Sequence, residues 1–237
     1  MKQITIIYIC CIKKQILING VLTNTKKKTE KMIHPKTELK FISQDVGYGV
    51  VAKEFIPAGT ITWVLDKLDR EFSPLSVQML EPVYKEIIDW YSFRNNKGNY
   101  VLCWDHGRYV NHSFNSNCLT TAHDFEVAVR DIQPGEQLTD DYGYLNIPYP
   151  FRGIDEGTRR KIVYPDDLIR YYKVWDKKIQ KVFGKIPTLE QPLKSVMSHE
   201  LWEKINLIIA GKEPMGSILQ NYYNNDQEEF PEPENSN

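Results

Sequence analysis

The sequence lacks an apolar segment long enough to cross a membrane as a helix. The apolar run at residues 4–12 ends at Lys13 after nine residues, whereas a membrane-spanning helix needs about 20. A signal peptide is not supported either, because only Lys2 supplies a charged start and no small-residue cleavage site follows. We therefore expect an intracellular protein without a membrane partner, located in the cytoplasm or, if the source is eukaryotic, in the nucleus.

The chain also has few cysteines and no pair with metal-binding spacing. Its four cysteines are Cys10, Cys11, Cys103 and Cys118, and none of them forms a C-x-x-C pair. We therefore expect no zinc site and no other metal site. So few thiols in 237 residues favour a reducing compartment over a disulfide scaffold. Internal repeats are missing as well, which excludes a repeat array.

A strong net charge is missing too. The formal net charge is −1, so the chain as a whole is not attracted to nucleic acid. Residues 1–33 form a lysine-rich extension and residues 224–237 form an acidic tail, and we expect both to be poorly ordered. The lysine cluster at residues 26–31 leaves one alternative open, a nucleic-acid-associated protein, although nucleic acid is not the ligand we expect. Met32 is an alternative translation start.

The sequence does contain a series of β-forming segments and a helical C-terminal region. Runs of β-branched and aromatic residues predict strands at residues 39–42, 50–52, 60–65, 100–104 and 125–130. Glycines predict a turn at residues 47–49. Pro74 and Pro82 predict two helix starts. Apolar residues recur at helical spacing between Pro165 and Gly184, and Ser198 predicts the cap of a last helix.

An early segment of the chain fits the motif of a nucleotide-binding fold. Residues 47–52 fit the dinucleotide-binding fingerprint G-x-G-x-x-A, with Asp66 and Asp69 about 20 residues further on. That fingerprint requires a helix to begin at the glycines, so that its N-terminus faces a pyrophosphate. β-Branched residues follow here instead, and Pro57 and Gly59 interrupt the chain soon after. We therefore reject a nucleotide-binding fold.

Two dense polar segments stand out in the middle of the chain. Residues 108–113 read RYVNHS, and residues 136–144 read EQLTDDYGY. Together with GYGV at residues 47–50 and IPAGTI at residues 56–61, they resemble the motifs of the SET-domain protein lysine methyltransferases, in the order and spacing of that family. The resemblance covers residues 38–146, and its motifs are specific in combination rather than singly.

The resemblance implies a mainly β fold of the SET type, a β-clip with knot-like threading of its C-terminal strand. The SET domain would span residues 34–148, with a helical insert at about 66–98 that forms one wall of the substrate groove. An α-helical C-terminal region would follow at residues 149–223. We expect this protein to be a monomer.

The activity implied by the resemblance is methyl transfer from S-adenosyl-L-methionine to a lysine side chain, with S-adenosyl-L-homocysteine as the product. The expected partner is a protein or peptide that bears a lysine; a histone is one candidate and is not established. Only the neutral amine attacks, and at pH 7 about one lysine in 2500 is neutral. An aromatic channel that aligns the amine and excludes water meets this demand.

Roles in the family carry over to individual positions of this chain. Tyr142 matches the catalytic tyrosine, and Tyr144 and Tyr109 are candidates for the substrate channel. The residues expected to contact the cofactor or shape its site are Gly47, Tyr48, Gly49, Arg108, Asn111 and His112. The glycines would let the main chain approach the cofactor closely.

The chain departs from the family pattern after the Asn-His pair. Phe114 stands where many members carry the first zinc-binding cysteine, and no cysteine follows Cys118. A zinc-bound tail is therefore not expected. The helical C-terminal region is expected to close the site instead, through Tyr171 or Trp175. Flanking cysteine-rich modules and histone-reading domains are not recognisable, so the histone assignment common in the family does not carry over.

A second departure lies beside the expected catalytic residue. Asp140 stands two residues before Tyr142, where many members carry a Phe or Tyr that influences the number of methyl groups added. A carboxylate there would hold the lysine in its charged form unless it turns away or binds a water. Two readings therefore remain: a methyltransferase, favoured by Asn111, His112 and Tyr142, and a catalytically inactive SET-fold binding module, favoured by Asp140.

Overall fold

The computed structural model describes residues 17–18, 21–22 and 33–224. The chain divides into two units, Met1–Glu30 and Lys31–Asn237. In the first unit, strand β1 (Leu17–Ile18) pairs antiparallel with β2 (Val21–Leu22). Apart from a few positions, the expected basic extension, including the apolar run at residues 4–12, and the acidic tail lie outside the described residues. Their order therefore stays a prediction.

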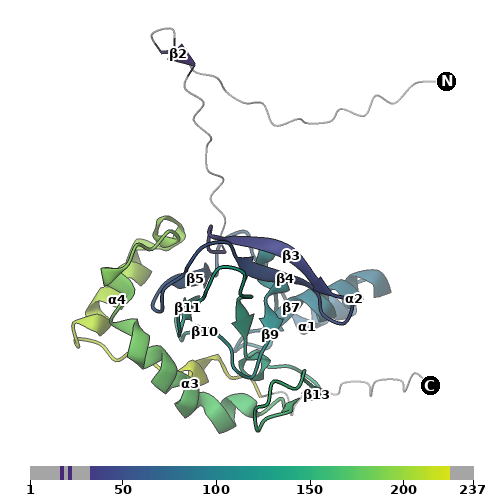
Figure 1. The fold of residues 1–237 in the computed structure, drawn as a ribbon. Helices are drawn as coiled ribbons and strands as arrows, with labels where there is room; N and C mark the ends of the chain where they lie inside the picture. The colour runs from purple at the N-terminus through teal and green to yellow at the C-terminus, as the bar shows by residue number, and fades with distance from the viewer. Residues whose placement is uncertain (1–16, 19–20, 23–32, 225–237) are drawn as a thin grey trace, which may run out of the picture. The chain divides into compact units, whose positions relative to one another are not determined.

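The second unit is built from small sheets with helices around them (Figure 1). Strands β3 (Thr37–Ser43) and β4 (Gly47–Ala52) form an antiparallel hairpin. Strand β5 (Ile61–Val64) belongs to a three-stranded antiparallel sheet of order β10-β11-β5, with β10 at Cys118–Thr120 and β11 at Phe125–Ala128. The other sheets are β6-β8-β7 (Arg70–Phe72, Tyr100–Leu102, Ser92–Arg94), β12-β9 (Thr139–Asp140, Asn111–His112) and β13-β14 (Phe151–Arg152, Ile162–Val163).

The β3–β4 hairpin turns slightly earlier than the sequence predicts. Its turn occupies residues 44–46, so Gly47 is the first residue of β4 and pairs with Ser43. The prediction of a turn at residues 47–49 was therefore wrong by a few positions. Gly47 has a φ of +76°, a left-handed conformation that glycine adopts without a steric penalty.

Two helices form the insert between β6 and β7, and both begin where prolines predict them. Helix α1 (Pro74–Gln78) follows Ser73, whose side chain accepts a hydrogen bond from the Ser76 amide, and α2 is Pro82–Tyr91. Most apolar residues of α2 are exposed: Ile88 is the buried residue of this helix, while Ile87 and Trp90 are 42% and 76% exposed.

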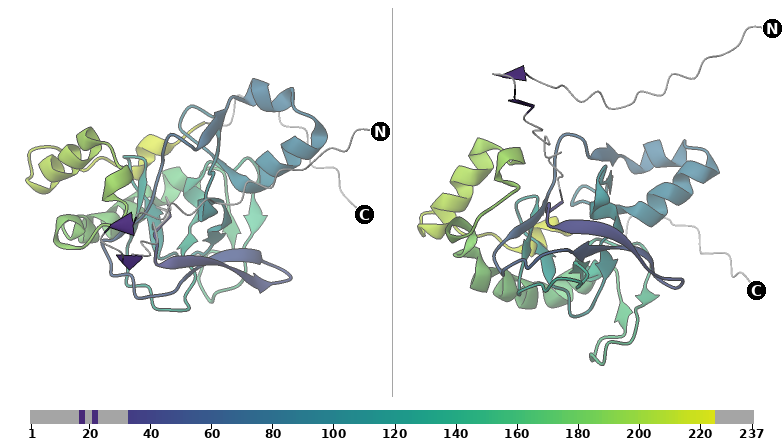
Figure 2. Two further views of the ribbon diagram at one scale, coloured as in Figure 1. Left: turned by 90° about the horizontal axis from the view of Figure 1, so that it is seen from above. Right: turned by 45° about the horizontal axis from the view of Figure 1, so that its top comes forward.

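The region predicted to be α-helical, residues 149–223, begins instead with the β13–β14 hairpin and continues with helix α3 (Asp167–Phe183), helix α4 (His199–Ile209) and short 3-10 turns. Leu168, Trp175 and Ile179 of α3 are buried at helical spacing, and they share one core with Phe125 and Val127 of β11. The helices therefore complete the core of the sheet rather than forming a separate body. Figure 2 shows α3 and α4 at the opposite end of this unit from α1 and α2.

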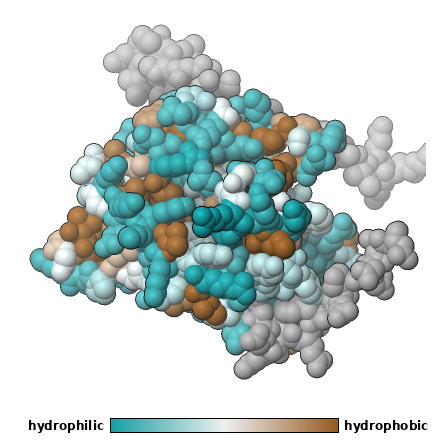
Figure 3. Space-filling model, turned by 60° about the horizontal axis from the view of Figure 1, so that its bottom comes forward, coloured by the Kyte–Doolittle hydropathy of each residue, from teal (hydrophilic) through white to brown (hydrophobic). Residues whose placement is uncertain are grey.

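A second core lies on the other face of the same sheet. It contains Val50, Ile56, Trp63, Cys103, Val110, Cys118, Ala128, Ile132 and Leu138 among its buried residues. The surface view of Figure 3 shows hydrophilic residues with scattered hydrophobic ones rather than one continuous apolar patch. Within the part of the chain that the structure describes, no helix is long and apolar enough to span a bilayer.

Candidate functional site

The two polar segments of the sequence meet in the short parallel sheet of β9 and β12. Asn111 pairs with Thr139 and His112 with Asp140. The amide of Ser113 continues this ladder by donating to the Asp140 carbonyl at 2.8 Å. The pairing brings the Asn-His segment and the Asp-Asp-Tyr segment together although about 30 residues separate them in the chain.

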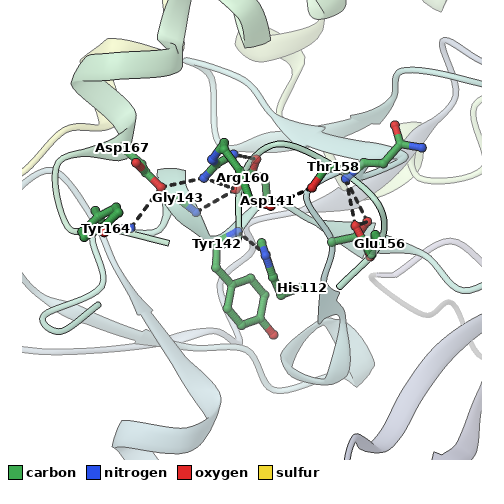
Figure 4. A network of polar contacts seen from close by, with 11 residues as sticks. His112, Asp141, Tyr142, Gly143, Glu156, Thr158, Arg160, Tyr164 and Asp167 are labelled. Carbon is green, nitrogen blue, oxygen red and sulfur yellow. Dashed lines mark hydrogen bonds and ion pairs between the residues drawn. The ribbon is translucent and has the colours of Figure 1, made fainter. Parts of the chain in front are cut away.

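Tyr142 is held by the segment that precedes and includes β9. It lies in the 3-10 turn η2 (Tyr142–Tyr144), rather than in a strand. Its amide donates to Nδ1 of His112 at 3.2 Å (Figure 4), and its hydroxyl donates to the Val110 carbonyl at 2.7 Å. Because both ends of the residue are bonded to Val110–His112, the position of the hydroxyl is fixed relative to the Asn-His pair.

The Tyr142 hydroxyl stays protonated at neutral pH. Burial, followed by the negative charges of Asp140 and Glu126, raises the pKa of Tyr142 far above its usual value of 10.0. A group in this state donates a hydrogen bond and contributes a dipole, and it does not accept a proton as a tyrosinate would. The chemistry available to Tyr142 is therefore orientation of a partner, not general base catalysis.

His112 is neutral and has one free donor. Burial, followed by the charge of Arg160, lowers the pKa of His112 from 6.5 to about 4. Since Nδ1 accepts the Tyr142 amide, the ring proton belongs on Nε2, which is buried and has no hydrogen-bond partner among the described residues. Aromatic rings surround the imidazole, with centroids at 4.4 Å for Phe114 and 5.4 Å for Phe151.

Asn111 connects the glycine-rich strand β4 to the site. Its Nδ2 donates to the Tyr48 carbonyl at 3.1 Å and to Gln137 Oε1 at 3.0 Å. A Cβ at Gly49 would lie 2.7 Å from Asn111 Nδ2 and 2.5 Å from Gln137 Oε1. Gly49 is therefore required because the Asn111 amide approaches the backbone of β4, whereas open space lies beside Gly47.

Tyr109 and Arg108 lie in an aromatic cluster at the surface. Tyr109 ends the 3-10 turn η1 (His106–Tyr109), and its ring contacts Tyr91 and Tyr48 at centroid distances of 5.4 and 6.4 Å. The Arg108 guanidinium lies 5.2 Å from the Tyr109 ring centroid. Tyr48 is 53% exposed, so this cluster presents aromatic surface to a ligand or partner.

Tyr144 has a different environment from the one expected for a channel residue. It is 1% exposed, and its ring contacts Trp175 of α3 edge to face at 5.5 Å. Its hydroxyl faces the Asp140 carboxylate, although no partner among the described residues has standard hydrogen-bond geometry with it. The ring thus joins the sheet to the C-terminal helices, and the hydroxyl alone faces the site.

Arg160 organises a charged cluster that the sequence did not reveal. It forms ion pairs with Asp141 and, at 2.6 Å, with Asp167 (Figure 4). Asp141 also accepts the Gly143 amide and so caps the turn that carries Tyr142. No motif distinguishes Arg160 from its neighbour Arg159 in the sequence, because the partners come from residues distant in the chain.

A cavity of about 290 Å³ lies beside this cluster. Aromatic rings of Phe114, Tyr171 and Trp175 line it together with Arg160, and the Arg160 guanidinium lies 5.0 Å from the Phe114 ring and 4.4 Å from the Tyr171 ring. Tyr171 and Trp175 are the two residues that the sequence proposed for closing the site. A second cavity, of about 220 Å³, is lined in part by His34 and Leu189 and contains Pro57 and Thr60 of the 56–61 motif, but none of the residues assigned to the cofactor or the channel.

The Asp140 side chain is buried in the interior, and a second carboxyl group accompanies it. Asp140 is 5% exposed, and Glu126 of β11 is half-buried next to it. Burial raises the pKa of Asp140 to about 6 and raises that of Glu126 still more. Glu126 therefore keeps its proton and uses it to donate a hydrogen bond to Asp140. Sequence reasoning missed Glu126; its only signal was a lone acid in an otherwise apolar strand.

Comparisons with known proteins place the residues from Gly47 to Gly143 within one family match, whereas Arg160 and the cavity residues of α3 lie beyond it. The family model described as SET domain matches residues 47–143. Among solved structures, 209 chains match. One is a humanised mutant of the Chaetomium thermophilum Polycomb Repressive Complex 2 bound to the inhibitor GSK126, with 24% identity, a TM-score of 0.35, and coverage of 47% of this chain and 15% of that chain. No curated protein sequence matches.

Proposed function

We propose, from the premise that residues 47–143 form a SET domain, that this protein transfers a methyl group from S-adenosyl-L-methionine to the side-chain nitrogen of a lysine in a protein or peptide. The observation that carries the proposal is the fixed hydroxyl of Tyr142, bonded to Val110 beside the Asn-His pair. This arrangement unites the two segments that the resemblance assigned to cofactor binding and catalysis.

The residues present fit the proposed cofactor. His112 has a buried Nε2 donor without a partner among the described residues, which suits a ligand acceptor. The aromatic cavity lined by Phe114, Tyr171 and Trp175 suits a flat heteroaromatic ring. When bound, S-adenosyl-L-methionine would supply the electrophilic methyl group. Asn111, together with the main chain at residues 47–49, would complete its site.

The chain itself has to position the lysine and remove water from it. Tyr142 would orient the lysine nitrogen through its protonated hydroxyl, because its pKa is too high for it to act as a base. Removing water favours the neutral amine, which is the form that attacks. The exposed aromatic cluster of Tyr48, Tyr91 and Tyr109 would hold the entering side chain or its flanking peptide.

Helix α3 would close the site in place of a zinc-bound tail. Trp175 and Tyr171 of α3 line the cavity next to Asp141 and Phe114. Because α3 also contributes to the main core, deleting residues 155–223 would unfold the domain rather than test the cofactor site. A substitution that alters the cavity, such as Tyr171→Ala, is the better test, with weaker cofactor binding in calorimetry as the expected result.

The first test is methyl transfer from labelled S-adenosyl-L-methionine to histones and to a cell lysate. We expect label on lysine with the wild type and a loss of about 100-fold or more with Tyr142→Phe, since orientation is lost. Tyr164→Phe, which removes the hydroxyl of an exposed tyrosine, is the matched control and should keep full activity. Equal transfer by Tyr142→Phe and wild type would refute the role of Tyr142.

A binding module without activity is the second candidate, and the buried carboxyl of Asp140 is the observation that favours it. A carboxylate beside the substrate nitrogen stabilises the unreactive ammonium. Calorimetry separates the two functions: cofactor binding without transfer by the wild type would support the module. Failure of the cofactor to bind would instead contradict the assignment of Asn111, His112 and residues 47–49.

A further inference from the structure

The Glu126–Asp140 pair is the feature of the site that the proposed chemistry leaves unexplained. Glu126 comes from β11 and Asp140 from β12, and Cys118 of β10 lies between the two strands. The Cys118 Sγ and one carboxylate oxygen from each acid all lie within 4.8 Å of one another. Three potential ligands thus converge close enough to Tyr142 for the charges of both acids to raise its pKa.

The pair has no cationic partner. The charges of Asp140 and Asp105 raise the pKa of Glu126, and the charge of Asp141 raises that of Asp140. No lysine or arginine of the described residues contributes to the pKa shift of either acid. Asp140 Oδ1 is buried without a hydrogen-bond partner in the same part of the chain. The Tyr144 hydroxyl, also buried and without a standard partner, faces the Asp140 carboxylate. The site therefore lacks a cation with hydrogen-bond donors.

A metal ion satisfies this cluster poorly. Burial, followed by the charges of Asp140 and Glu126, raises the pKa of the Cys118 thiol well above 9.0. A thiol must lose its proton to ligate a metal, which leaves two carboxyl groups as the ligands. A primary ammonium needs only acceptors for its three N–H bonds, and Asp140, Glu126 and the lone pairs of the Tyr144 hydroxyl can supply them.

We propose that the Glu126–Asp140 pair binds the ammonium of the substrate lysine and accepts one of its protons. This inference rests on the proposed methyl transfer and names the base for it. In the step, one N–H bond of the ammonium breaks, the proton forms an O–H bond on Asp140, and the electron pair stays on nitrogen. The nitrogen then bonds to the methyl carbon as the carbon–sulfur bond breaks, and the partly buried Glu126 relays the Asp140 proton towards solvent.

The surroundings make this proton transfer feasible. A lysine in water holds its proton far more strongly than a carboxylate does. Removing the ion pair from water lowers the pKa of the lysine and raises that of the carboxyl, so the neutral pair becomes accessible. The titratable groups that face the pair are Cys103, Asp105, Cys118, Asp141, Tyr142 and Tyr144. All of them are neutral or negative, so none opposes binding of a cation.

Infrared difference spectroscopy tests whether the Glu126–Asp140 pair binds an ammonium, and it needs no transfer assay. At pH 7 we expect a C=O stretch of a protonated carboxyl in the wild type that is missing in Glu126→Gln. n-Butylammonium should shift or remove this band, whereas tetramethylammonium, which has no N–H donor, should not. A missing band, an equal response to both cations, or a response to Zn²⁺ in place of n-butylammonium would overturn the proposal.

The transferase assay tests whether Asp140 accepts a proton from the substrate ammonium. We expect Asp140→Asn to lower kcat/KM about 100-fold, within the range for loss of a general base, and to lose the acidic limb of the pH profile near the wild-type Asp140 pKa of about 6. Glu126→Gln should lower kcat/KM less than Asp140→Asn does, because its amide replaces the hydrogen bond donated to Asp140 but cannot relay the proton. Glu54→Gln, an exposed glutamate paired with Lys36, is the matched control.

The outcomes separate this inference from the proposed function. Wild-type rates with Asp140→Asn would overturn the inference while leaving methyl transfer in place. A wild type that responds to n-butylammonium but transfers no label would refute methyl transfer and the proton step, while the ammonium site would stand. Calorimetry of cofactor binding by Asp140→Asn, expected to match the wild type, excludes a folding defect as the cause of lost activity.

Discussion

Asp140 and Asp141 are neighbours in the sequence and both are buried, yet their surroundings differ completely. Asp141, 1% exposed, has Arg160 and the Gly143 amide as partners. Asp140, 5% exposed, lies beside a second carboxyl group, a tyrosine hydroxyl and a thiol, and no lysine or arginine of the described residues pairs with it. A buried charge that is paired contributes to the fold, whereas an unpaired one costs stability and is kept where a ligand or a reaction uses it.

This comparison assigns the two aspartates to different tasks. The Asp141–Arg160–Asp167 cluster ties turn η2 to helix α3 and so fixes the position of Tyr142. In the Glu126–Asp140 pair a carboxyl of β11 faces one of β12, and no lysine or arginine of the described residues neutralises the two acids. Burial raises the pKa of both aspartates, and at Asp141 the Arg160 guanidinium counteracts this rise.

The largest effect on stability is expected from removing the cation of the paired cluster. Arg160→Leu leaves Asp141 and Asp167 buried without their partner, and it should lower the free energy of unfolding by about 3–5 kcal/mol. Urea denaturation of this variant beside Arg159→Leu measures it, since the exposed Arg159 should change stability by less than about 0.5 kcal/mol. Equal stability of the two variants would show that the cluster does not hold the fold.

Asp140→Asn should raise the free energy of unfolding, by a somewhat smaller amount than Arg160→Leu lowers it. The folded-state pKa of Asp140 is raised from 3.8 to about 6, so the folded protein binds this proton more tightly than the unfolded chain does. The wild type therefore loses stability as the pH rises between these values and does not regain it above them. At pH 7.5 the variant should be more stable by about 3 kcal/mol, at about 1.36 kcal/mol per pH unit.

The pH dependence is the control for that prediction. Below pH 3.8 the carboxyl is protonated in both states, so the wild type and Asp140→Asn should unfold at the same urea concentration after correction for the amide itself. A variant that is less stable than the wild type at pH 7.5 would mean that Asp140 has a partner that stabilises its charge.

Asp141→Asn should lower the free energy of unfolding by about 2 kcal/mol, the usual contribution of a hydrogen bond to a charged group. The asparagine oxygen can still accept the Gly143 amide, and Arg160 keeps its ion pair with Asp167. Thermal unfolding of the two Asp→Asn variants at one pH measures the contrast. If both substitutions shifted the melting temperature in the same direction, the two aspartates would not have the different roles assigned to them.

Much of the fold could be predicted from local sequence. Pro82 and Ser198 start α2 and α4 as predicted, because a fixed φ and a side-chain cap act within one turn. The prediction of a mainly β fold of the SET type is confirmed, since its motifs lie within the matched residues 47–143. The exposure of the apolar face of α2 was not predictable, because periodicity shows which residues share a face and not what covers it.

The candidate site was predictable only where its residues belong to motifs. Tyr142, Asn111 and His112 meet through the β9–β12 pairing. Arg160 and Glu126 could not be found, because their roles depend on partners 19 and 14 residues away that the tertiary structure places beside them. The pairing shows that Tyr142, Asn111 and His112 meet, but their roles stay predictions, as do the assignments of Gly47, Tyr48, Gly49, Arg108, Tyr109 and Tyr144 to cofactor or channel.

The smallest expected effect concerns His112, and it contrasts with the pH dependence expected at Asp140. With a pKa lowered to about 4, the imidazole stays neutral between pH 6 and 8, so its Nε2 donor is the same throughout. Cofactor affinity measured by calorimetry should therefore change less than about twofold over this range, whereas an unperturbed histidine would titrate within it. His112→Gln, whose amide is also neutral, should show the same flat profile at lower affinity. A wild-type affinity that changes tenfold near pH 6.5 would mean that the ring takes up a proton, and the Tyr142 amide would then have no acceptor on His112.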